Sequence, residues 1–255
     1  MHGKAGLPVR IRDASSRALA TLPTVELGHE HRNIQGGGAR AAVFGISDGL
    51  VSNVALILGV AAADPSGGTV RLAGLAGLVG GAFSMAAGEY VSMRAQSELM
   101  QHELDVERNA LRAFPEGERR ELAAIYEQRG LEPDLAAELS TKMMRDPEVA
   151  LETHAREELG INPANTGNPL QAAVSSFVMF AAGALVPLLP WFFTHGTPAI
   201  LWTMALGAVS AFSVGAALAH FTKRPWLWSA TRQLLISVVA ASVTFAIGHV
   251  IGASG

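Results

Sequence analysis

Five stretches of about 20 mostly apolar residues dominate this sequence and limit what it can fold into. They lie at residues 43–63, 72–93, 170–190, 198–219 and 230–251. Each is long enough to cross a bilayer as an α-helix, and the whole chain is 49% hydrophobic with a mean hydropathy of +0.29. The sequence therefore predicts an all-α membrane protein with five transmembrane helices.

The charge and cysteine content exclude several classes of protein. The net charge of -3 and the pI of about 6.2 lack the strongly basic character of a nucleic-acid binder, so we expect no nucleic-acid partner. The chain has no cysteine, so a bound metal must use oxygen, nitrogen or thioether ligands. Residues 1–40 hold no continuous apolar stretch, which argues against a signal peptide and predicts a cytosolic, partly disordered arm.

A charged segment at residues 94–162 separates the second and third apolar stretches. It contains the signals that begin and end short helices: Pro115, Pro133 and Asp146-Pro147 at starts, Gly130 and Gly160 at ends. We expect three or four soluble helices here. The predicted organisation is an arm at 1–40, two spans at 41–93, a helical domain at 94–162 and three spans at 163–255.

The distribution of Lys and Arg predicts the orientation, because these residues favour cytoplasmic loops. They gather in the arm, in the 94–162 domain and after the fourth span, whereas the opposite loops show only Arg71. The 94–162 domain and the N-terminus are therefore expected in the cytosol, and the C-terminus outside. Short loops and a composition rich in Ala, Gly and Arg favour a bacterial plasma membrane.

Polar residues inside the first two spans predict an ion path. A charged side chain within a bilayer is costly, so Asp48 in the first span is a functional candidate by default. Counted from the same face, Asp48 lies about 8 Å deep and Met85 of the second span about 12 Å deep, so the two could meet. Glu89 shares a helix face with Met85, and Asn53 lies further out. A carboxylate beside a thioether suits a first-row divalent ion.

The alternative is structural: Asp48 is a hydrogen-bonded residue near the interface and Met85 is ordinary packing.

The 94–162 domain offers further candidate metal ligands, in pairs whose spacing places both side chains on one helix face. These pairs are Glu103 with Glu107, Glu118 with Glu121, and His154 with Glu158. Folded together, they could surround one or two metal ions, as in di-iron helical bundles, although acidic helix faces are also common as solvated surfaces.

The chain also resembles a known family. The segments FGISDGLVSNVALILGV, GGAFSMAAGEYVSM, FPEGERRELAAIYEQRGL and DPEVALETHAREELGI are similar to those of the vacuolar iron transporter family, over residues 30–251. The resemblance implies five transmembrane helices with a cytosolic helical metal-binding domain inserted between the second and third spans, a homodimer, and proton-coupled export of ferrous iron or manganese. It places the family's pathway residues on Asp48 and Met85, and its cytosolic glutamates on Glu107, Glu118, Glu121 and Glu158.

Two departures from the family pattern bear on the cytosolic site. One family glutamate falls on Ala110, and a methionine beside the last ligand helix is His154 here. Histidine can bind a divalent metal, whereas the lost carboxylate could reduce the number or affinity of sites, with Glu103 as a possible substitute.

The function predicted from these residues is a divalent metal/proton antiporter that exports Fe²⁺, and also Mn²⁺, from the cytosol. Its partners would be metal ions, protons, the lipid bilayer and a second copy of the chain, with no prosthetic group. The alternative is a membrane-anchored metal-binding or sensing protein without transport. An enzyme is disfavoured because the sequence shows no nucleophile motif, intramembrane zinc signature or phosphate-binding glycine loop.

Overall fold

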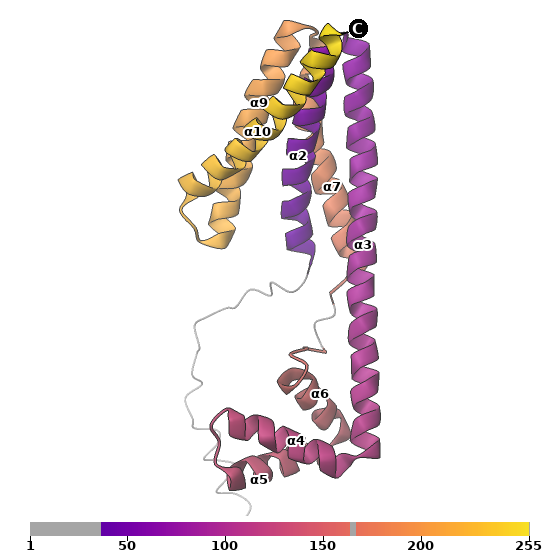
Figure 1. Ribbon diagram of the computed structural model, residues 1–255, viewed down its shortest axis with the longest axis vertical. Helices are drawn as coiled ribbons and strands as arrows, with labels where there is room; N and C mark the ends of the chain where they lie inside the picture. The colour runs from indigo at the N-terminus through magenta and orange to yellow at the C-terminus, as the bar shows by residue number, and fades with distance from the viewer. Residues whose placement is uncertain (1–36, 164–166, 255) are drawn as a thin grey trace, which may run out of the picture. The chain divides into compact units, whose positions relative to one another are not determined.

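The computed structural model describes residues 37–163 and 167–254, and within these ranges the chain is helical, without strands (Figure 1). The helices are α2 (Gly38–Ala63), α3 (Gly67–Ala113), α4 (Pro115–Gln128), α5 (Pro133–Met143), α6 (Pro147–Glu157), α7 (Pro169–Leu188), α8 (Pro190–Phe193), α9 (Thr197–Thr222) and α10 (Trp226–Ala253). The predicted arm lies outside the described residues up to residue 36, and α2 begins inside its last few positions.

Five of these helices are long and apolar enough to cross a membrane: α2, α3, α7, α9 and α10. The predicted number of spans is therefore confirmed, and the chain is a multi-pass membrane protein. Helix α3 has 47 residues, which corresponds to about 70 Å at 1.5 Å per residue. This is more than twice the thickness of a bilayer's hydrocarbon core, about 30 Å, so α3 continues well beyond its apolar part.

The C-terminal part of α3 from Arg94 onward, together with α4, α5 and α6, forms what we call the insert. Its short helices begin where the sequence predicted, with Pro115, Pro133 and Pro147 each in a first turn. Asp146 caps α6 by accepting hydrogen bonds from the backbone N–H groups of Glu148 and Val149. Buried Leu104 on α3 packs against Leu151 and Ala155 on α6, so α3 and α6 share one small core.

Helix α2 is packed closely between two other spans. On one side its Gly45 and Gly49 lie against the backbone of α7, and Gly183 of α7 lies against α2 in return. On the other side Gly248 of α10 meets the backbone of Gly59. Such small residues let membrane helices approach until their backbones touch, which is a main source of packing energy in lipid.

The contact at Gly49 gives a direct test of this packing. A Cβ atom there would lie 2.2 Å from the carbonyl oxygen of Phe180, so Gly49→Ala must push α2 and α7 apart. We expect a loss of about 1–3 kcal/mol, seen as a lower melting temperature in detergent. Gly68→Ala is the control, because a methyl group there meets no atom within 4 Å. Equal melting of the two variants would contradict the close α2–α7 contact.

Candidate functional site

A cavity of about 330 Å³ lies between α2 and α3. Asp48 and Asn53 of α2 and Met85 of α3 all line it. The remaining lining residues are small or apolar, and two of them carry a hydroxyl group. They are Ser52, Leu56, Gly77, Gly81, Ser84 and Phe180. Asp48 and Met85, which helical depth placed at similar levels, therefore line the same cavity, which brings together a carboxylate, a thioether and an amide.

Two glycines on α3 border the cavity and let α3 pack closely against α2 and α7. Gly77 faces Leu56 and the amide oxygen of Asn53, and Gly81 faces the ring of Phe180; a Cβ at either position would meet these atoms within 3 Å. The side chain of Asp48 is exposed on the surface of the single chain, one turn from Ser52, whose hydroxyl donates to the Asp48 carbonyl oxygen at 2.6 Å. The carboxylate oxygens are thus left available to a ligand or to a neighbouring molecule.

Glu89 takes a different place from the one expected. It does not line the cavity; its carboxylate oxygen pairs with a guanidinium nitrogen of Arg40 at 2.6 Å. Glu89 is only 12% exposed, whereas Arg40 is 65% exposed. This ion pair joins the first turn of α2 to α3 on the insert side of the cavity, since Glu89 follows Met85 by one helical turn.

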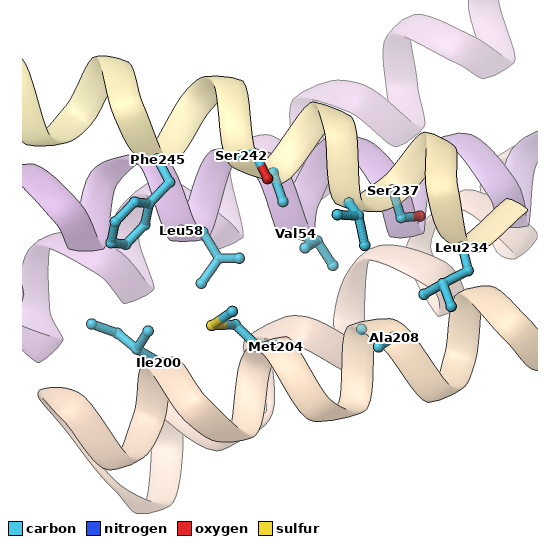
Figure 2. A pocket seen from close by; sticks show the side chains of 12 residues that line it. Val54, Leu58, Ile200, Met204, Ala208, Leu234, Ser237, Ser242 and Phe245 are labelled. Atoms are coloured by element: carbon cyan, nitrogen blue, oxygen red, sulfur yellow. The ribbon is translucent and has the colours of Figure 1, made fainter.

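A second cavity, of about 310 Å³, lies between α2, α9 and α10 (Figure 2). Its lining is aliphatic or aromatic apart from the hydroxyls of Ser237 and Ser242 and the thioether of Met204. Among the described residues, none with a carboxylate, imidazole or amide side chain lines it. Although the two cavities have similar volumes, the chemistry of their walls favours the α2–α3 cavity as a cation site.

The insert holds a compact group of four possible metal ligands, which we call the insert cluster: Glu107, Glu118, His154 and Glu158. One ligand atom from each lies within 4.8 Å of the others. Nδ1 of His154 is 3.1 Å from an oxygen of Glu107, 3.5 Å from one of Glu158 and 3.8 Å from one of Glu118. Helices α3, α4 and α6 contribute to the cluster, so the fold of the insert assembles it.

His154 lies at the centre of the insert cluster and is 0% exposed. Although its Nδ1 is close to three carboxylates, neither ring nitrogen makes a hydrogen bond of normal geometry, and one oxygen of Glu107 is also buried without a partner. Buried polar atoms are normally hydrogen-bonded, so the unpaired Nδ1 of His154 and the neighbouring oxygen of Glu107 favour a role as metal ligands. Carboxylate and imidazole together suit a first-row divalent metal.

The electrostatics of the cluster point the same way. Burial, with repulsion from Glu158, Glu118 and Glu121, raises the pKa of Glu107 from 4.5 to about 7. Burial also raises the pKa of Glu118, and Glu121 and Glu158 add to the shift, while His154 opposes it. Crowded carboxylates without a cation hold protons more tightly, and a metal ion would relieve the same repulsion.

Two predicted ligands lie outside the insert cluster. Glu121 acts on Glu107 and Glu118 through its charge, but its side chain is exposed and is not among the four converging groups. Glu103 is half-buried one turn before Glu107 and is also not among them, so it does not replace the carboxylate missing at Ala110.

Sequence reasoning missed several neighbours of these sites. Arg40 was not considered as a partner of Glu89, and Ser52, Ser84 and Phe180 were not proposed for the cavity. Ser52 follows Asp48 by four residues, so helical spacing could have indicated that it lines the same cavity. Ser84 precedes Met85 by one residue, a spacing that gives no such indication. No local pattern links positions 49 apart, such as Arg40 and Glu89.

The raised pKa of Glu107 predicts a pH dependence of metal binding at the insert cluster. Below about pH 7 Glu107 carries a proton that an incoming metal must displace, so affinity should rise with pH. For one group of this pKa we expect Mn²⁺ to bind about 10-fold more tightly at pH 8 than at pH 6, measured by calorimetry. Glu107→Gln should weaken binding and flatten this dependence, whereas Glu103→Gln should keep it. A wild-type pH profile in Glu107→Gln would refute the assignment.

Comparison with known proteins identifies the family of the chain. The VIT family profile matches residues 39–249. A vacuolar iron transporter of Acanthamoeba castellanii is 35% identical over 240 residues, covering 90% of this chain and 85% of the relative. Vacuolar iron transporter 1 of Arabidopsis thaliana is 30% identical, over 83% of this chain and 85% of the relative. Vacuolar iron transporter 1 of Oryza sativa subsp. japonica is also 30% identical, over 94% of this chain and 93% of the relative. The chain belongs to the VIT family.

Proposed function

We propose that the protein is a divalent metal/proton antiporter that moves Fe²⁺, and also Mn²⁺, out of the cytosol. The observation that carries the proposal is the cavity between α2 and α3, where the carboxylate of Asp48, the thioether of Met85 and the amide of Asn53 line one space between membrane spans. A charge in a span is costly, and an apolar anchor needs none of these groups. The names of the relatives support iron as cargo.

In this proposal the insert captures the ion first. Three carboxylates and one imidazole can replace part of the hydration shell of a divalent metal, and α3 carries both Glu107 and Met85. The two residues are 22 positions apart, or about 33 Å along the helix. The Lys and Arg bias favours a cytosolic insert, and composition alone favours a bacterial plasma membrane as host.

Proton coupling follows from the ligands. A carboxylate or imidazole that binds a metal must first lose its proton, so proton and metal compete for the same lone pairs. In the insert cluster Glu107 has a pKa near 7, so the exchange falls in the physiological range. Asp48 would make the corresponding exchange within the membrane. The metal is cargo in this scheme, and no prosthetic group takes part.

We further propose that the antiporter is a homodimer. Asp48 is exposed on the surface of the single chain, and contact between its carboxylate and lipid would cost free energy. On α3, Gly80 and Gly88 have open space where their side chains would be, and Ser84 between them is exposed, so one stripe of small residues is free to approach another helix. Gly77 and Gly81, by contrast, pack within the chain. A second copy across this stripe would cover the cavity.

Transport into proteoliposomes tests the proposed function. Fe²⁺ or Mn²⁺ flux driven by a proton gradient should fall at least about 10-fold in Asp48→Asn, because the neutral amide can neither exchange a proton nor balance the cation. Metal binding to the insert should be unchanged in the same variant. A protein that binds metal but carries none would be the anchored sensor, and full flux in Asp48→Asn would exclude the assigned role of this carboxylate.

The homodimer has its own test. Gly80→Leu places a bulky side chain on the free stripe of α3, where the added Cβ has no atom of its own chain within 4 Å. We expect the mass measured by light scattering in detergent to fall from dimer to monomer while the helix content is kept. Gly68→Leu, at another open position of α3 outside the stripe, should remain dimeric. An unchanged dimer in Gly80→Leu would rule out this interface.

A further inference from the structure

The side chain of Asn53 is held in one orientation by α7. Its Nδ2 donates to the carbonyl oxygen of Ala184 at 2.6 Å, across a buried contact between α2 and α7. A carbonyl oxygen only accepts hydrogen bonds, so the NH₂ end of the amide must face Ala184. The orientation of this amide is therefore fixed by the chemistry of its partner.

The same contact aims the other end of the amide at the cavity. Oδ1 of Asn53 is buried and accepts no hydrogen bond, and the residue is only 2% exposed. The oxygen lies 2.9 Å from the point where a Cβ on Gly77 would sit, in the wall of the α2–α3 cavity. A buried carbonyl oxygen without a partner is rare, and the residue that carries this one lines the α2–α3 cavity beside Asp48.

We propose that Oδ1 of Asn53 is a ligand of the transported ion, reached after Asp48 and Met85, and that it favours hard ions. This inference rests on the proposed transport function. Asn53 follows Asp48 by five residues, or about 7.5 Å along α2, so the two oxygens mark successive levels of one cavity. An amide oxygen carries no net charge, so it replaces a water ligand of the ion without holding it as a second carboxylate would.

The hydrogen bond from Asn53 to the carbonyl oxygen of Ala184, which we call the clamp, makes Oδ1 of Asn53 a selective ligand. Oxygen donors suit Mn²⁺, whereas a thioether favours softer metals, so Asp48 with Asn53 offsets the preference of Met85. A free amide could turn either end toward the ion, and its NH₂ end would repel a cation. Because the hydrogen bond to Ala184 fixes the acceptor end in the cavity, the packing of α2 on α7 sets the ligand geometry.

Two variants test this role separately from folding. Asn53→Leu removes the oxygen and the clamp, whereas Gly77→Ala keeps Asn53 and its clamp and places a methyl group against the oxygen. The other atom met by that methyl group is the flexible end of Leu56, which can move. Gly68→Ala is the control on the same helix, where the added methyl group meets nothing within 4 Å.

The measurement is the flux of Mn²⁺ and of Fe²⁺, each alone, into proteoliposomes at equal protein density. We expect Mn²⁺ flux to fall at least 10-fold in Asn53→Leu and in Gly77→Ala, and Fe²⁺ flux to fall no more than 3-fold, with both unchanged in Gly68→Ala. Equal losses for the two metals would indicate a structural role and overturn the inference, as would wild-type flux ratios in Gly77→Ala. If wild type carries neither metal, the proposed function itself fails.

Discussion

The close approach of α2 to α7 is the contact on which the candidate transport site depends. Gly49 and Gly183 let the two backbones touch, so α2 cannot rotate or slide without a clash. This fixes which residues of α2 face α3: Asp48 and Asn53 line the cavity. In a membrane, where lipid competes for apolar surface as well as a helix does, such backbone packing determines the position of a polar side chain more than hydrophobicity does.

Both candidate sites contain buried polar atoms that the protein leaves unpaired. Oδ1 of Asn53, both ring nitrogens of His154 and one oxygen of Glu107 lack hydrogen-bond partners. Each costs free energy in the folded protein, of the order of 1–3 kcal/mol for a neutral group. Asn53 lines the α2–α3 cavity, and Glu107 and His154 belong to the insert cluster. In the proposed function a metal ion would supply the partner that these groups lack.

Much of the fold could be predicted from the sequence because the membrane imposes simple rules. Spans must be long, apolar and helical, and prolines and a capping aspartate mark the starts of the insert helices, so all five spans and the starts of α4, α5 and α6 were expected. Helical depth also indicated that Asp48 and Met85 could lie near each other, and both line the α2–α3 cavity.

The prediction of the sites was less complete, because side-chain partners depend on how helices pack. Glu103 shares a helix face with Glu107 but lies outside the insert cluster, since α6 meets α3 around Leu104 and places His154 beside Glu107. The pairing of Glu89 with Arg40 and the clamp of Asn53 on Ala184 join residues 49 and 131 positions apart. Helical periodicity carries no information on contacts at such separations.

The composition of the insert cluster bears on how many ions it holds. Its three carboxylates carry a charge of about -3 when ionised, which one divalent ion reduces to about -1. A second ion would leave an excess positive charge and would need further ligands, yet Glu103 lies outside the cluster and Ala110 offers no donor. The imidazole of His154 adds a nitrogen without adding charge. In the proposed function the four groups therefore suit a single metal ion, and the charge of the exposed Glu121, which acts on Glu107, would also attract it.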